Sequence, residues 1–112
     1  MGGRRLSSPI EEIKSHYDVV VIGSGYGAGI SASRMARAGR KVCILERGKE
    51  LQPGEYPNTD LKVTSELQIQ TEDCQLGSRT GMYDLHAFKD MSVFVGCGLG
   101  GTSLVNSNVV PV

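Results

Sequence analysis

The 112-residue sequence lacks the features that mark membrane-spanning, nucleic-acid-binding and repeat proteins. No apolar run approaches the roughly 20 residues that a membrane-spanning helix needs. Twelve Lys and Arg balance twelve Asp and Glu, and no basic block interleaved with aromatic residues indicates binding to nucleic acid. No internal repeat is present, and the length suits one small domain.

Metal ligands and catalytic groups are also scarce. The three cysteines, Cys43, Cys74 and Cys97, are odd in number and show no C-x-x-C spacing, so we expect free thiols and no metal site. His86 has no Cys, Asp or second His at ligand spacing, which favours a surface or packing role. No acid–base pair or activated nucleophile can be placed, so no catalytic residue is predicted.

Residues 1–16 carry no stretch of signal-peptide character. Arg4 and Arg5 stand near the start, but charged residues interrupt the segment before any apolar run can develop. We expect a flexible leader here and a cytoplasmic protein.

Glycine is abundant, and its fifteen residues gather in two places. The first is the stretch YDVVVIGSGYGAGISASRMARAGRKVCILE, residues 17–46. Residues 17–22 predict a buried strand, a helix follows the glycine turn to about Ala38, and Gly39 ends it. Residues 41–45 predict a second strand that leads to Glu46. This is one βαβ unit with the dinucleotide fingerprint at its first turn.

Each residue type in the fingerprint suits a nucleotide. Gly23 permits the tight turn, Gly25 lets backbone approach a pyrophosphate, and Ala28 occupies the third small position beside the strand. The helix N-terminus offers unpaired N–H groups to phosphates. Glu46 lies twenty-one residues after Gly25, close to the spacing of the acid that binds a ribose. The alternative is a glycine-rich turn without a ligand.

The middle of the chain is less informative. Arg47 either reaches the adenosine end of a ligand or is a solvated charge, and the sequence does not decide between them. Residues 59–71 predict a short amphipathic helix or strand, with alternation at residues 67–70. Residues 73–81 are turn-rich, and residues 82–88 predict an edge strand.

The second glycine cluster lies in MSVFVGCGLGGTSLVNSN, residues 91–108. A short apolar strand at residues 92–95 runs directly into Gly96, Gly98, Gly100 and Gly101. Such a segment is either a loop between packed elements or a second close approach to a ligand. Because it follows a dinucleotide fingerprint, we expect both clusters to serve one ligand.

Together the two clusters resemble the N-terminal FAD-binding part of glucose-methanol-choline (GMC) oxidoreductases, in the cholesterol-oxidase-like branch. The resemblance covers residues 17–112 and leaves the leader, residues 1–16, outside it. It implies an α/β, partial Rossmann-like FAD-binding fold, and FAD as cofactor. One departure is Ser107-Asn108, where that branch often has Gly-Gly.

The resemblance also implies roles for individual residues. Gly23, Gly25, Tyr26 and Gly27 would surround the pyrophosphate, beside Ala28. Glu46 would bind the adenosine ribose with Arg47 nearby. The positions implied toward the flavin are Gly101, Thr102, Asn106 and Val109.

The implied reaction is oxidation of an alcohol CH–OH group by flavin, with a sterol as one possible substrate. In the family, the substrate domain and the catalytic residues follow far downstream of the segment that these 112 residues match. We therefore expect an incomplete domain that is not catalytically complete. Two alternatives stay open: an NAD-binding module, and a non-enzymatic interaction fragment of a split flavoprotein.

Overall fold

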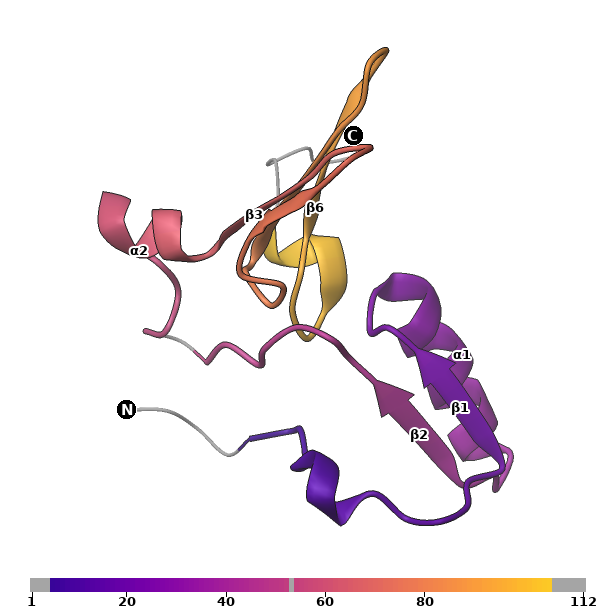
Figure 1. Ribbon diagram of the computed structural model, residues 1–112. Coiled ribbons are helices and arrows are strands. Elements are labelled where there is room, and N and C mark those ends of the chain that lie inside the picture. Colours follow the sequence, from indigo (N-terminus) through magenta and orange to yellow (C-terminus); the bar gives the residue numbers. More distant parts are fainter. Residues whose placement is uncertain (1–4, 53, 106–112) are drawn as a thin grey trace, which may run out of the picture.

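The computed structural model describes residues 5–52 and 54–105, so the predicted site residues Asn106 and Val109 lie outside the described part. Its first unit consists of β1 (Val19–Ile22), α1 (Tyr26–Arg37) and β2 (Val42–Leu45). β1 and β2 pair in parallel, and α1 packs against both strands (Figure 1). The predicted βαβ unit is confirmed, with strands one or two residues shorter than expected.

The end of α1 follows from local sequence. Gly39 adopts a φ of 83°, a left-handed conformation that favours glycine, and its N–H donates to the carbonyl of Ala36. Basic residues in the last turn complement the negative end of the helix dipole. Only a narrow strip of α1 is buried: Ala32 is buried, whereas Met35 and Ala36 are exposed. A two-stranded sheet is too narrow to cover more of the helix.

One face of β1 is uncovered. Val20 and Ile22 are 52% and 79% exposed, whereas Val19 and Val21 are half-buried. Alternate residues of a strand point to opposite faces of its sheet, so a single apolar side of β1 faces solvent.

The second unit is a four-stranded mixed sheet with two short helices. Its elements are α2 (Asp60–Ser65), β3 (Leu67–Gln70), β4 (Gln75–Gly77), β5 (Tyr83–Ala87), β6 (Ser92–Gly96) and η2 (Gly101–Val105), while the short helix η1 (Ile10–Glu12) precedes β1. The strand order is β4-β3-β5-β6, in which β3 and β5 are parallel and the other pairs are antiparallel.

Two expectations for this region need correction. The strand predicted at residues 82–88 is not an edge strand, because β5 lies between β3 and β6. A tight turn, closed by the Phe88 N–H and the Met91 carbonyl, brings β6 beside β5. The polar stretch predicted as turns contains β4, which pairs with β3. Both pairings satisfy backbone groups with segments that local composition does not reveal.

The described chain is open and has a small apolar core. Its radius of gyration is 16.0 Å, against about 13 Å expected for a compact domain of roughly this length. The buried apolar residues of the described part are Ala32, Met82 and Cys97. Because the apolar core is small, polar and backbone contacts make much of the connection between the two sheets. The elements themselves confirm the predicted α/β class with a partial Rossmann-like unit.

Candidate nucleotide site

The turn after β1 is shaped by one glycine and left open by another. Gly23 has a φ of 91° and donates its N–H to the carbonyl of Leu45, so a side chain here would be strained. Gly25 instead has extended backbone, which any residue can adopt, and an added Cβ would meet nothing within 4 Å. The absence of a side chain at Gly25 therefore keeps space clear in front of α1.

The N-terminus of α1 suits an anion. Gly25 is its N-cap, no side chain caps the first turn, and no acidic residue lies in that turn. The first N–H groups of a helix have no intrahelical acceptor and carry a partial positive charge. Tyr26 is 78% exposed beside them, and Ala28 is half-buried. A pyrophosphate fits this open and uncapped end.

The second glycine cluster lies directly against the first. After β6 the chain passes through Gly100 and Gly101, both with positive φ, into η2. A Cβ on Gly101 would lie 2.8 Å from the Cα of Gly25, so backbone packs on backbone at this point. The two clusters are thus brought together, as a shared ligand requires. Thr102, also predicted here, is exposed in η2.

Ser24 joins the two clusters and was missed by the sequence reasoning. Its hydroxyl donates to Oε2 of Glu46 at 2.6 Å and accepts the N–H of Gly100 at 3.0 Å. Ser24 stands at an unspecified position of the G-x-G pattern, so the motif assigns it no role. The available signal was a hydroxyl between two glycines, upstream of the expected acid.

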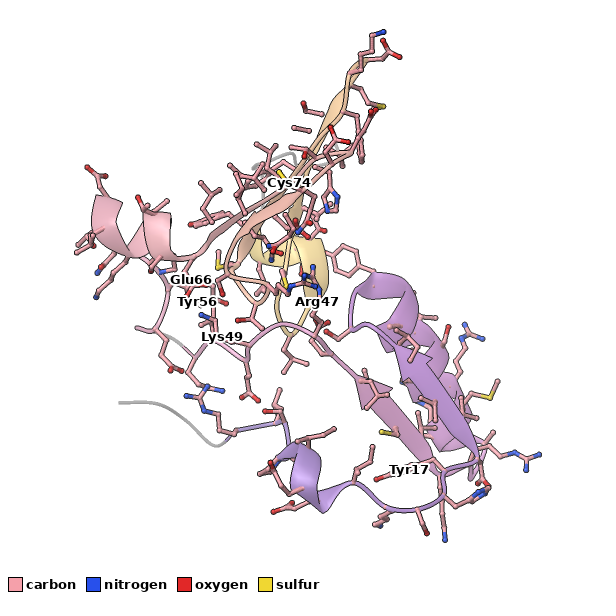
Figure 2. The ribbon with its side chains drawn as sticks, viewed as in Figure 1. Tyr17, Arg47, Lys49, Tyr56, Glu66 and Cys74 are labelled. Carbon is pink, nitrogen blue, oxygen red and sulfur yellow. The ribbon has the colours of Figure 1, made fainter. Side chains whose placement is uncertain are left out.

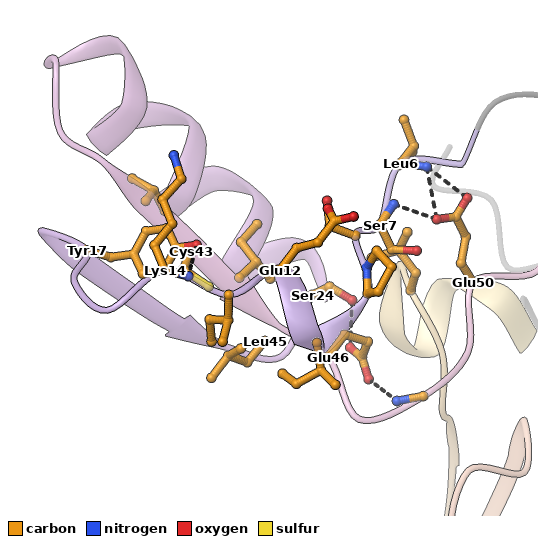
Figure 3. Close-up of a pocket in the computed structure, with 18 of the residues that line it drawn as sticks. Leu6, Ser7, Glu12, Lys14, Tyr17, Ser24, Cys43, Leu45, Glu46 and Glu50 are labelled. Atoms are coloured by element: carbon orange, nitrogen blue, oxygen red, sulfur yellow. Dashed lines mark hydrogen bonds between the residues drawn. The ribbon is translucent and has the colours of Figure 1, made fainter.

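Glu46 is held by two donors at the carboxyl end of β2. Ser24 donates to Oε2, and the N–H of Gly48 donates to Oε1 at 2.8 Å (Figure 3). A carboxylate oxygen accepts more than one hydrogen bond, so each oxygen keeps capacity for a ribose hydroxyl. The two donors fix the orientation of the carboxylate before any ligand arrives.

Backbone contact also joins the segment after β2 to the segment after β6. A Cβ on Gly48 would lie 2.3 Å from the backbone N of Gly98, and Leu99 donates its N–H to the carbonyl of Lys49. Cys97 is a buried thiol at this junction, and burial raises its pKa. Glycine at position 48 is what allows the two segments to touch.

Arg47 is directed into the second sheet (Figure 2). Its guanidinium donates to Oδ2 of Asp84 at 2.9 Å, to Oε1 of Gln68 at 3.1 Å and to the carbonyl of Arg79 at 2.8 Å. Asp84 and Gln68 are almost fully buried. Arg47 therefore anchors the end of β2 to β3 and β5, a contact that neither of its predicted roles included.

His86 is less isolated than the sequence indicated. Its Nε2 lies 3.1 Å from Oδ2 of Asp84, because residues two apart on β5 project from the same face. Within the described residues, no group of three or more His, Cys, Asp and Glu is placed to hold a metal ion.

A cavity of about 1010 Å³ adjoins these residues (Figure 3). Ser24, Glu46, Gly48 and Gly100 line its inner side together with β2. Most of the other lining residues lie between Leu6 and Tyr17, in the leader and just before β1. In the described part of the chain, no helix is long and apolar enough to cross a membrane.

Comparison with known proteins agrees with this geometry. Residues 18–53 match the family described as FAD binding domain. A cholesterol oxidase of Mycobacterium tuberculosis is 30% identical over 89% of this chain and 16% of its own length. A long-chain-alcohol oxidase of Arabidopsis thaliana is 35% identical over 80% of this chain and 11% of its own length. The chain thus spans less than a fifth of the length of each of these two relatives.

A third relative matches a shorter stretch of this chain. A dihydrolipoyl dehydrogenase of Corynebacterium glutamicum is 53% identical, but over 29% of this chain. The oxidases match over most of the chain, including the region after the fingerprint.

The fold and the uncapped, glycine-lined helix end define a dinucleotide-binding α/β protein, and the family match identifies FAD as its cofactor. The chain is similar to proteins named cholesterol oxidase and long-chain-alcohol oxidase, which are GMC-type FAD oxidoreductases.

Proposed function

We propose that this chain binds FAD as part of a flavin-dependent oxidoreductase that acts on the CH–OH group of alcohols, with sterols among the candidate substrates. The observation that carries the proposal is the meeting of two glycine segments at the open N-terminus of α1, beside Glu46. The names of the two oxidase relatives support the alcohol as substrate class. Bound FAD would supply the hydride acceptor.

The proposed roles follow the order of groups along FAD. Backbone at Gly23, Gly25, Tyr26 and Gly27 binds the pyrophosphate, with Ala28 keeping α1 close to β1. Glu46 accepts hydrogen bonds from the adenosine ribose, and Ser24 holds the carboxylate in place. Gly101 and Thr102 lie on the flavin side, and Asn106 and Val109 are proposed there from the resemblance alone. Arg47, beside Glu46 in the sequence, anchors the end of β2 to the second sheet through Asp84.

The domain arrangement and the location in the cell are part of the proposal. Residues 17–112 form the first portion of an FAD-binding domain that follows the leader, residues 1–16. We place no catalytic residue in this chain, so substrate binding and proton transfer depend on groups outside it. The cytoplasmic location stays a prediction from the sequence.

The test is the variant Gly25→Asp, with FAD affinity measured by quenching of flavin fluorescence. A carboxylate at this position would face the pyrophosphate, and we expect at least about 100-fold weaker binding. The fold should survive, because a Cβ here meets nothing and Asp is a favoured N-cap.

Gly29→Asp is the matched control, since Gly29 is an exposed glycine in the same helix with open space around it. It should leave FAD affinity within about twofold. Equal affinity of wild type and Gly25→Asp would show that the cofactor binds elsewhere.

NAD(H) is the competing ligand, because Glu46 suits the adenosine ribose of either cofactor. The family match and the second glycine cluster against Gly25 favour FAD. Calorimetric titration of both ligands distinguishes them, and tighter binding of NADH than of FAD would reverse the choice.

A further inference from the structure

The leader crosses the outer side of the cavity and is attached at one end. The N–H groups of Leu6 and Ser7 donate to the carboxylate of Glu50, at 3.0 and 2.7 Å (Figure 3). Arg5 donates to the carbonyl of Glu50 and pairs with Glu55 at 2.8 Å. Residues 5–14, here named the leader strap, are thereby tied to the loop that follows Glu46.

The other end of the leader strap is also held. The backbone N–H of Lys14 donates to the hydroxyl of Tyr17, just before β1. Between the two attachments, η1 carries Ile10 and is followed by Ile13; both line the cavity yet are 66% and 48% exposed. These aliphatic side chains face open space rather than a packed core.

The opposite wall of the cavity is also largely apolar. Val42, Ile44 and Leu45 of β2 contribute to it, and Glu46 and Ser24 border it at the carboxyl end of the strand. A planar aromatic ring with polar edges fits between two aliphatic walls, because its faces are apolar. The cavity is large enough for the adenosine half of a dinucleotide.

The order of groups along FAD selects adenosine for this cavity. In the proposed binding of FAD, the pyrophosphate lies at α1, the ribose at Glu46 and the flavin toward η2. The cavity begins at Leu99 and Gly100, just before η2, and continues past Glu46 along β2. The base attached to the ribose at Glu46 therefore enters the space beneath the leader strap.

We propose that the leader strap forms the outer wall of the adenosine subsite and that Glu50 latches it closed over the adenine. The proposal rests on the proposed binding of FAD and assigns a ligand-binding role to a segment that precedes the βαβ unit. The strap makes the subsite two-sided, so it contributes affinity through contact with the base and by excluding water.

The experiment compares ADP and FAD binding by isothermal titration to wild type, Glu50→Ala and Ser7→Pro. Glu50→Ala removes the acceptor, whereas Ser7→Pro removes one donor from the strap and leaves Glu50 intact. We expect each variant to bind ADP about tenfold more weakly. Glu72→Ala, at an exposed glutamate outside the cavity, is the control and should bind like wild type.

Limited digestion with trypsin measures directly how accessible the leader strap is. ADP should slow cleavage after Lys14 severalfold in wild type and have little effect in Glu50→Ala. The role of the strap is overturned, and the proposed function is not, if wild type binds FAD but all variants bind ADP equally and ADP gives no protection at Lys14. A wild-type chain that binds neither FAD nor ADP overturns the proposed function together with it.

Discussion

At the scale of single residues, Ser24 connects more of the site than the glycines around it. One hydroxyl bridges Glu46, 22 residues ahead, and Gly100, 76 residues ahead. Without it, the Gly100 N–H would lose its acceptor and Glu46 would lose one of two orienting donors. An unpaired, partly buried donor costs about 1 kcal/mol or more.

We therefore expect Ser24→Ala to weaken FAD binding about tenfold, or about 1.4 kcal/mol. Ser33→Ala is the matched control, because the Ser33 hydroxyl bonds within α1 to the Ile30 carbonyl and is exposed. Flavin fluorescence quenching measures both affinities. If Ser24→Ala binds FAD as tightly as Ser33→Ala does, Ser24 does not orient Glu46.

Arg47 and Asp84 form an ion pair that supports the fold. Asp84 is 1% exposed, and its Oδ1 has no hydrogen-bond partner among the described residues. The guanidinium of Arg47 pairs with the other carboxylate oxygen, Oδ2, and the arginine side chain is about half exposed. Removing the arginine would leave a buried carboxylate dependent on His86.

We expect Arg47→Met to lower the free energy of unfolding by about 2 kcal/mol. This is below the roughly 3–5 kcal/mol typical of fully buried pairs, because solvent screens the exposed guanidinium. Adding Asp84→Asn should recover about half of the loss, since it removes the uncompensated charge. Urea unfolding followed by circular dichroism measures both, and a double variant less stable than Arg47→Met would exclude this explanation.

At the scale of elements, two segments far apart in sequence are packed backbone to backbone. The end of β2 meets the end of β6 at Gly48 and Gly98, where no Cβ fits. This contact joins the βαβ unit to the second sheet. Backbone atoms approach each other directly here, and the side chain of Leu104 packs beside Gly98.

Gly48→Ala should therefore destabilise the chain by about 1–3 kcal/mol through overpacking. Gly29→Ala, in α1 with open space around it, should instead stabilise by about 0.5–1 kcal/mol. Thermal unfolding of both variants gives opposite shifts in midpoint. Shifts of the same sign would mean that the junction opens without cost.

At the scale of the whole molecule, the leader is bound to the loop after β2 by an ionised carboxylate. Hydrogen bonding by Ser7, followed by Leu6 and Gln52, lowers the pKa of Glu50 to about 2 from 4.5, although burial opposes the shift. A carboxyl with a depressed pKa stabilises the fold above its unfolded pKa. That contribution is lost as the pH falls through the folded value.

Stability that depends on Glu50 should therefore be complete above about pH 4.5 and fall away toward pH 2. The urea midpoint of wild type should drop more steeply across this window than that of Glu50→Gln. Glu55, whose pKa is lowered by its hydrogen bond with Arg5, contributes in the same direction and is present in both proteins. Parallel curves for the two proteins would show that the latch adds no stability.

The sequence alone determined the βαβ unit, its glycine turn and the position of Glu46. Strand, turn, helix and strand are signalled within thirty consecutive residues, where periodicity and the conformational range of glycine act locally. The family resemblance and FAD followed from those residues and from the second glycine cluster.

Only the tertiary structure decided how distant segments meet. Ser24 reaches Gly100, Arg47 reaches Asp84 in the second sheet, and β5 becomes an inner strand rather than an edge. The two side-chain contacts depend on partners 76 and 37 residues away. Hydrogen-bonding groups take whichever partner the folded backbone brings near, and local sequence does not specify that partner.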